Sequence, residues 1–118
     1  MGDFRELRVW CVAKDLSVKI YQLTQEEAFA KDYGLKDQIR RAAVSVPSNI
    51  AEGDERESNK EAVRYLYIAK GSLAEVLTQL IIAYEIGYIG EDELRKLEQE
   101  IEHLSTMLSK LIGFRKHA

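Results

Sequence analysis

Residues that would place this chain outside the cytoplasm or in a membrane are scarce. A single cysteine, Cys11, occurs among 118 residues, so no disulfide can form within the chain. Because small secreted proteins usually depend on disulfides, we expect a cytoplasmic protein. The longest uninterrupted apolar run lies near residues 80–84 and is far shorter than the ~18 residues of a membrane span. These absences predict neither secretion nor contact with a membrane.

An excess of basic residues is also missing. The net charge is −3 and the isoelectric point is about 5.5. A protein that binds polyanions over its whole surface usually carries a positive excess. The composition therefore argues against that class, although it is compatible with a local basic patch.

The sequence also lacks side-chain patterns that would indicate catalysis or a metal. One Glu-x-x-His motif occurs, at Glu100 and His103. Di-iron helical bundles use that motif twice, so we expect both residues to be surface residues. Only two histidines are available to activate Cys11, which is therefore expected to pack rather than to react. We predict no catalytic residue, metal or cofactor and a protein that is not an enzyme, with a metal-dependent nuclease as the alternative of another class.

What the sequence does contain is helical periodicity, without the alternation that is typical of strands. The apolar spacing predicts helices over residues 4–23, 33–52, 59–86 and 91–112 within a single domain, 1–118. Asp3 and Ser58 are expected to cap the first and third helices, and glycines to follow the ends of the others, at Gly53 and Gly113. The segment 25–32 is expected to be a polar connector. Short links between four helices predict an all-α protein, an antiparallel up-down four-helix bundle.

The third predicted helix carries more apolar residues than one bundle needs. Besides its core row, Ile68, Ile82 and Ile86 lie on a second side, and Ile81 and Tyr84 lie on a third. A helix that is apolar on nearly all sides is usually enclosed, so we predict an oligomer in which another chain covers it. The alternative is a wide core face with scattered exposed apolar residues.

Pro47 lies inside the second predicted helix. Proline has no N–H, and its ring clashes with the carbonyl of Ala43, at a cost of ~3 kcal/mol in a helix interior. Because Ile50 keeps the apolar phase of Val46, we predict that the helix continues through a kink. A serine or a water is expected to satisfy the freed carbonyl, and a functional hinge is the alternative.

A narrow polar line crosses the same helix. Its residues are Arg41, Ser45, Ser48 and Glu52. Apolar residues on both sides predict that the line is partly buried. Arg41 is expected to pair with Glu75 of the third helix, directly or through Ser45 and Ser72, and Gly71 is expected to allow close helix approach.

The stretch QIRRAAVSVPSNIAEG, residues 38–53, resembles the signature of the four-helix-bundle proteins encoded by intervening sequences of bacterial large-subunit (23S) ribosomal RNA genes. The similarity extends over nearly the whole chain and includes VW at 9–10, YGL at 33–35, IAKGSLAE at 68–75 and GY at 87–88. The resemblance implies a small helical bundle that assembles as a homopentamer. The positions that carry the structural signature are Arg41, Ser45, Pro47, Asn49, Glu52, Gly53 and Glu75.

This family is similar to the accessory variability determinant of diversity-generating retroelements, which assists a reverse transcriptase and contacts RNA. The resemblance implies a non-enzymatic, oligomeric binding or scaffold protein associated with structured RNA, with binding of a reverse transcriptase as the alternative. The basic residues that we expect to contact nucleic acid are Arg5, Arg8, Lys19, Arg40 and Lys60. Their spacing is also that of ordinary surface charges, but an oligomer would repeat even a weak patch and raise its avidity.

Overall fold

The computed structural model describes residues 3–118. The chain forms a short 3-10 helix, η1 (Phe4–Glu6), and five α-helices, and this part of it contains no strand. The α-helices are α1 (Arg8–Leu23), α2 (Glu27–Lys31), α3 (Tyr33–Asp54), α4 (Asn59–Glu85) and α5 (Glu91–Lys116). The all-α prediction is confirmed.

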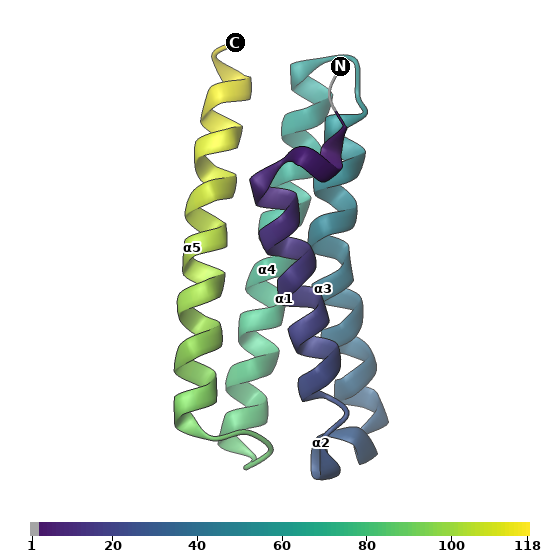
Figure 1. The fold of residues 1–118 in the computed structure, drawn as a ribbon, viewed down its shortest axis with the longest axis vertical. Helices are drawn as coiled ribbons and strands as arrows, with labels where there is room; N and C mark the ends of the chain where they lie inside the picture. The colour runs from purple at the N-terminus through teal and green to yellow at the C-terminus, as the bar shows by residue number, and fades with distance from the viewer. Residues whose placement is uncertain (1–2) are drawn as a thin grey trace.

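The four long helices, α1, α3, α4 and α5, lie side by side and are joined alternately at the two ends of the molecule (Figure 1). The molecule measures 45 × 21 × 20 Å. Helix α3 contacts both α1 and α4, and α4 also contacts α5, whereas α1 and α5 touch more sparsely. Each large apolar side chain that is fully buried stabilises the fold by ~1.5–3 kcal/mol. The largest of them are Phe29, Ile20, Ile39, Ile50, Leu73, Leu80, Leu104 and Leu108.

Local signals determine where α4 begins and ends. The Oγ of Ser58 accepts a hydrogen bond from the backbone N–H of Glu61 at 3.2 Å, as the capping motif predicts. Gly87 follows the helix with a φ of 87°, a left-handed conformation that glycine adopts without strain. The observed helix therefore ends one residue before the predicted limit at residue 86.

Two predicted helix ends are wrong. Helix α3 continues through Gly53, and α5 continues through Gly113. Glycine ends a helix when its backbone turns left-handed, and among residues 3–118 only Gly87 has a positive φ. The glycines at the other two positions have helical backbones and cannot be recognised as such from the sequence.

The first predicted helix is interrupted near its start. Leu7 has an extended backbone, with ψ of 124°, between η1 and α1. Asp3 caps η1 and not α1, because its carboxylate accepts a hydrogen bond from the N–H of Arg5 at 2.9 Å. The ring of Phe4 packs edge-on against Trp10 with centroids 5.2 Å apart, so an aromatic contact joins η1 to α1.

The segment expected to be a polar connector contains α2 and a buried aromatic side chain. Phe29 is 1% exposed, and its ring centroid lies 5.5 Å from that of Tyr88, which follows α4. The Tyr88 hydroxyl donates to Asp32 Oδ2 at 2.9 Å, and Asp32 Oδ1 caps α3 by accepting from the N–H of Leu35 at 3.1 Å. The Leu35 N–H first, and then the Tyr88 hydroxyl, lower the pKa of Asp32 because both stabilise the carboxylate.

Pro47 lies within α3, and the helix continues past it as predicted. Its missing N–H frees the carbonyl of Ala43, which accepts a hydrogen bond from Ser17 Oγ of α1 at 2.8 Å. Ser17 is buried, so this carbonyl is satisfied by protein inside the fold. The prediction that a serine satisfies the carbonyl is confirmed, and the serine belongs to a different helix.

Helix α4 is long and apolar enough to cross a membrane when judged by length and composition alone. Its most apolar window has a mean hydropathy of 1.3, and 44% of that window is buried inside the molecule. The core helix of a bundle meets the same measure because neighbouring helices surround it.

Candidate nucleic-acid interface

The polar line of α3 is joined to α4 by hydrogen bonds. The Oγ atoms of Ser45 and Ser72 lie 2.8 Å apart, and Asn49 Nδ2 donates to both the carbonyl O and the Oγ of Ser45. A groove of about 360 Å³ lies beside these bonds. Its lining residues are Gln38, Arg41, Ala42, Ser45, Ser72, Glu75 and Gln79.

Arg41 and Glu75 line this groove, but both side chains are exposed to solvent. The ion pairs formed among residues 3–118 do not join them. The predicted direct pair is therefore wrong within one chain, while the serines predicted to bridge the two helices do bond to each other. Because Arg41 is not buried, its removal is expected to cost less than ~1 kcal/mol.

The C-terminal part of the signature lies where α3 approaches α4. Glu52 is exposed and pairs with Arg56. Gly53 is buried, and a Cβ there would lie 3.1 Å from the carbonyl oxygen of Ala62 and 3.2 Å from the Cβ of Tyr65. A side chain at this position would press against α4, so glycine suits the close approach of the two helices.

Gly71, by contrast, does not mediate a close approach. It is exposed, and no atom lies within 4 Å of the position that its Cβ would occupy. The prediction that Gly71 allows two helices to approach is wrong within the chain.

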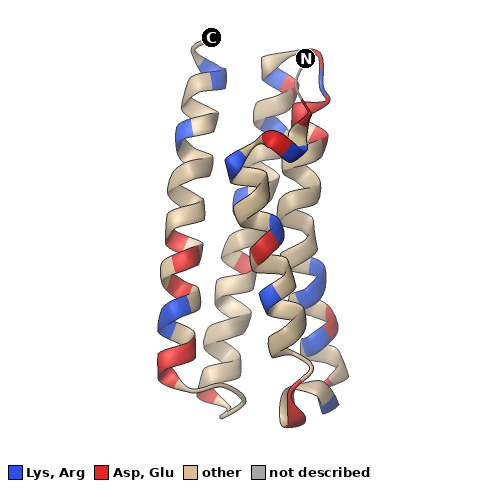
Figure 2. Ribbon diagram, viewed as in Figure 1, with Lys and Arg blue, Asp and Glu red and all other residues tan. Residues whose placement is uncertain are grey.

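Basic and acidic residues are interspersed over most of the molecule (Figure 2). Two of the predicted RNA-contacting residues form ion pairs with carboxylates of the same chain. Arg5 pairs with Asp3, and its side-chain hydrogen bond lowers the pKa of Asp3 to about 2. Lys19 of α1 pairs with Glu100 of α5. These carboxylates offset part of the positive charge of Arg5 and Lys19.

Arg8 and Lys60 are exposed, and neither forms an ion pair within residues 3–118. They lie in the first turns of α1 and α4, which begin at the same end of the molecule (Figure 1). Lys60 lines a groove of about 300 Å³ together with Arg115 and Lys116 of α5.

Arg40 lies in the other half of the molecule, where the beginning of α3 packs beside the end of α1. Its Nε donates to Thr24 Oγ1 at 2.8 Å, and its Nη2 donates to the carbonyl O of Tyr21 at 3.2 Å. The guanidinium carbon also lies 4.3 Å from the centroid of the Tyr21 ring. These three contacts fix the position of Arg40. Because their partners are neutral, they do not compensate its positive charge.

A second cation–aromatic contact lies one helical turn before Arg40 and was missed by the sequence analysis. Lys36 Nζ lies 4.8 Å from the centroid of the Tyr33 ring. Tyr33 is 69% exposed to solvent, which is high for a large side chain. Residues three apart on a helix are neighbours, so the spacing of Tyr33 and Lys36 was the available signal. Figure 2 shows basic residues gathered on this half of α3, with an acidic residue among them.

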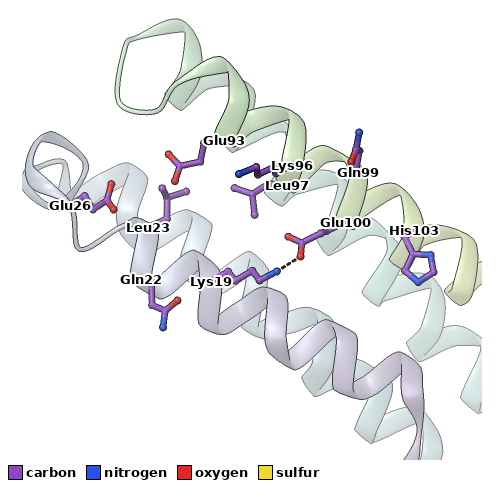
Figure 3. A pocket seen from close by; sticks show the side chains of 10 residues that line it. All are labelled: Lys19, Gln22, Leu23, Glu26, Glu93, Lys96, Leu97, Gln99, Glu100 and His103. Carbon is purple, nitrogen blue, oxygen red and sulfur yellow. Dashed lines mark hydrogen bonds and ion pairs between the residues drawn. The ribbon is translucent and has the colours of Figure 1, made fainter.

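A groove of about 700 Å³ opens where α1 and α5 touch sparsely (Figure 3). Buried Leu23 and Leu97 line it, together with side chains of both charges. Burial, and then the charge of nearby Glu26, raise the pKa of Glu93. The charged residues of the groove are Lys19, Glu26, Glu93, Lys96 and Glu100.

This groove offers no metal site. In the described part of the chain, no group of three or more His, Cys, Asp or Glu side chains could hold a metal ion. Glu100 of the Glu-x-x-His motif is engaged with Lys19, and His103 is exposed at the edge of the groove (Figure 3).

These observations define a small all-helical protein whose distinctive features are a polar seam between α3 and α4 and a local group of basic residues on the first half of α3. Residues 5–110 match the sequence model of the 23S rRNA-intervening sequence protein family, and the chain belongs to this family. The resemblance carried by residues 38–53 is thereby confirmed.

Among solved structures, the chain is similar to a protein of unknown function from the S23 ribosomal protein family of Bacteroides thetaiotaomicron VPI-5482. The two share 21% sequence identity with a TM-score of 0.81, and the similarity covers 88% of this chain and 97% of the other. It shows a common fold. Comparison with curated proteins gives no match.

Proposed function

We propose that this protein is a non-enzymatic homo-oligomer that binds or scaffolds structured RNA in the cytoplasm. Its unit is an antiparallel up-down four-helix bundle, and the ring of five implied by the family resemblance is the expected assembly. The observation that carries the RNA proposal is that Arg8, Arg40 and Arg41 have no carboxylate partner within residues 3–118, although the chain is net acidic.

Exposed apolar side chains of α4 support the oligomer. By helical spacing, Ile68 and Ile82 share the side of Ser72 and Gln79, which bond to α3, whereas Ile81 and Tyr84 share the side of Lys70, which bonds to α5. All four are between 36% and 45% exposed. Contiguous exposed apolar residues of this size usually mark an interface. A closed ring of more than two copies needs two different contact surfaces on each copy, which the two edges of α4 would supply.

The family and the basic residues support RNA as the partner. The family description refers to segments that interrupt 23S rRNA. In a ring, each basic residue is repeated once per copy, so weak contacts act together and raise avidity.

The test is a salt series of binding to a folded RNA stem-loop. It compares the wild type with Arg8→Glu and with the matched reversal Lys14→Glu, because Lys14 already pairs with Asp15 at 2.8 Å. We expect wild-type affinity to fall steeply with salt, since binding releases counterions from the phosphates. Arg8→Glu should weaken binding more than Lys14→Glu. A wild type that binds no RNA at low salt would contradict the proposal and favour a protein partner such as a reverse transcriptase.

A further inference from the structure

The surface that α1 and α3 share near the start of α3 combines accessible aromatic rings with fixed positive charges. We propose that unpaired segments of RNA bind there, with bases stacked on Tyr21 and Tyr33 and phosphates bound by Lys36, Arg40 and Arg41. These five residues are called the tyrosine–arginine strip. The inference rests on the proposed RNA binding and narrows it to one face of the protein and to single-stranded RNA.

The strip follows α3 over two helical turns. Tyr33 and Arg40 are seven positions apart, which corresponds to ~10 Å along a helix that rises ~1.5 Å per residue. Tyr21 of α1 lies at the level of Arg40, because the guanidinium is 4.3 Å from its ring centroid. Successive stacked nucleotides rise ~3.4 Å, so about three of them would cover the length of the strip along α3.

Both rings are accessible while a cation of α3 lies against each. Tyr33 is 69% exposed and Tyr21 is 39% exposed. Aromatic rings of this kind stack on any base, because every base has a flat face, and arginine adds a favourable cation–π contribution. Hydrogen bonds from Arg40 to Thr24 and to the Tyr21 carbonyl hold one of these pairs in place before any ligand arrives.

The charge of the strip suits a phosphate backbone. None of its three basic residues forms an ion pair with a carboxylate among residues 3–118. A groove of about 620 Å³ lies beside Tyr21, Arg40 and Arg41, and the one carboxylate that lines it is Asp37. Among the groove residues, two arginines and one aspartate leave a charge of +1, in a chain whose net charge is −3.

The combination favours single strands over duplex RNA. In a duplex the base faces are covered by neighbouring bases, so only phosphates and sugars remain for a basic surface to contact. Unpaired bases can turn outward and stack on tyrosine. Arg5 and Lys19, which are offset by Asp3 and Glu100, lack this uncompensated charge.

The experiment measures fluorescence anisotropy of a labelled single-stranded RNA hexanucleotide and of a labelled folded stem-loop with the full chain. It compares the wild type with Tyr33→Ala, Tyr33→Phe and Arg41→Gln. Phe114→Ala is the matched control, because Phe114 is 70% exposed and lies near the end of α5.

We expect Tyr33→Ala to lower affinity for the hexanucleotide about 5- to 100-fold, the range that loss of one stacking contact produces. Tyr33→Phe keeps the ring and should stay within about twofold of the wild type, as should Phe114→Ala. Arg41→Gln should reduce the slope of log affinity against log salt by about 0.7 for each lost phosphate contact, whereas Tyr33→Ala should leave that slope unchanged.

A wild type that binds the stem-loop but not the hexanucleotide would contradict single-strand binding at the tyrosine–arginine strip and leave the proposed function intact. The same conclusion would follow if Tyr33→Ala and the wild type bound the hexanucleotide equally. A wild type that binds neither RNA would overturn both proposals. Because Tyr33 and Arg41 are both exposed, thermal unfolding of the two variants should match that of the wild type, so a change in binding reports on the surface.

Discussion

At the scale of single residues, Pro47 determines how α1 and α3 are joined. A helix normally satisfies each carbonyl with an N–H four residues later, and Pro47 has none to offer Ala43. The hydroxyl of Ser17 takes that place at 2.8 Å. One backbone hydrogen bond of α3 is thus replaced by a tertiary contact, so the small side chain of Ser17 contributes to the stability of α3 as well as of α1.

Replacing Ser17 with alanine should lower the free energy of unfolding by ~1–3 kcal/mol, because the Ala43 carbonyl would stay buried without a donor. In a Pro47→Ala background, residue 47 regains an N–H for that carbonyl, so the same Ser17→Ala change should cost less. Urea unfolding of the wild type, both single variants and the double variant measures the coupling. If Ser17→Ala lowered the free energy of unfolding equally in both backgrounds, the proposed coupling between Ser17 and Pro47 would be contradicted.

The sequence predicts parts of this arrangement but not their pairing. The apolar rows place Ser17 toward the core, and Pro47 by itself predicts a free carbonyl at Ala43. Periodicity gives the face of a helix on which a residue lies, but not the rotamer or the partner of its side chain. For the same reason Arg41 and Glu75 are correctly placed along one groove and wrongly paired.

At the scale of helices, Gly53 and Gly71 should respond in opposite ways to an added methyl group. Gly53→Ala places a Cβ 3.1 Å from the Ala62 carbonyl oxygen and should lower the free energy of unfolding by ~1 kcal/mol or more. Gly71→Ala meets no atom within 4 Å and should raise it by up to ~1 kcal/mol through helix propensity. Urea unfolding of the two variants tests this, and a loss of stability at Gly71 would contradict the open space found there.

The cap of α3 should make stability depend on pH. The folded pKa of Asp32 lies below its ordinary value, so the carboxylate contributes stability above the unfolded pKa of ~3.9. That contribution is lost as the pH falls through the folded pKa. Asn at position 32 can still cap the helix but cannot titrate.

Urea unfolding between neutral and acidic pH should therefore show a smaller acid loss for Asp32→Asn than for the wild type. The matched control is Asp15→Asn, because among residues 3–118 Asp15 forms an ion pair with the exposed side chain of Lys14 alone. Identical pH profiles for Asp32→Asn and the wild type would show that this carboxylate does not contribute to the loss of stability at acidic pH.

The elements that the sequence could not predict depend on contacts made elsewhere. Phe29 lies between two alanines in a segment whose other residues are polar or charged, and its burial follows from packing that includes Tyr88, far away in the sequence. The ends of α3 and α5 were misplaced because a helical glycine and a terminating glycine differ in backbone conformation and not in residue type. The long apolar rows and the cap at Ser58, which are local features, predicted the helices well.

At the scale of the whole molecule, the edges of α4 should control assembly. Each chain has a mass of 13.5 kDa, and we expect sedimentation at micromolar concentration to give a mass several times larger. Ile82→Lys puts a charge into the proposed interface and should shift the protein toward the mass of one chain. Val18→Lys on α1 is the matched control, because Val18 and Ile82 are 48% and 45% exposed. A wild type that sediments as a single chain would rule out the interface.

The candidate RNA surface was only partly predictable. Arg40 was expected among the contacting residues, but its ring partner Tyr21 lies on a helix 19 positions earlier, and only folding brings the two together. Arg5, Arg8 and Lys19 are expected to contact RNA together because their spacing places them on one side of the first predicted helix. Spacing could not show that Asp3 and Glu100 compensate two of these charges.

Because Ser17 completes the hydrogen bonding of α3, α1 and α3 should open and close as one cooperative unit. Separating them breaks apolar packing and also leaves a backbone acceptor unsatisfied. Local opening of one helix near this bond should therefore be coupled to opening of the other. Helix α5 touches α1 only sparsely and is anchored mainly through α4. We therefore expect the amides of α1 and α3 around residues 17 and 43 to exchange together, whereas α5 takes no part in this bond and should open independently of it.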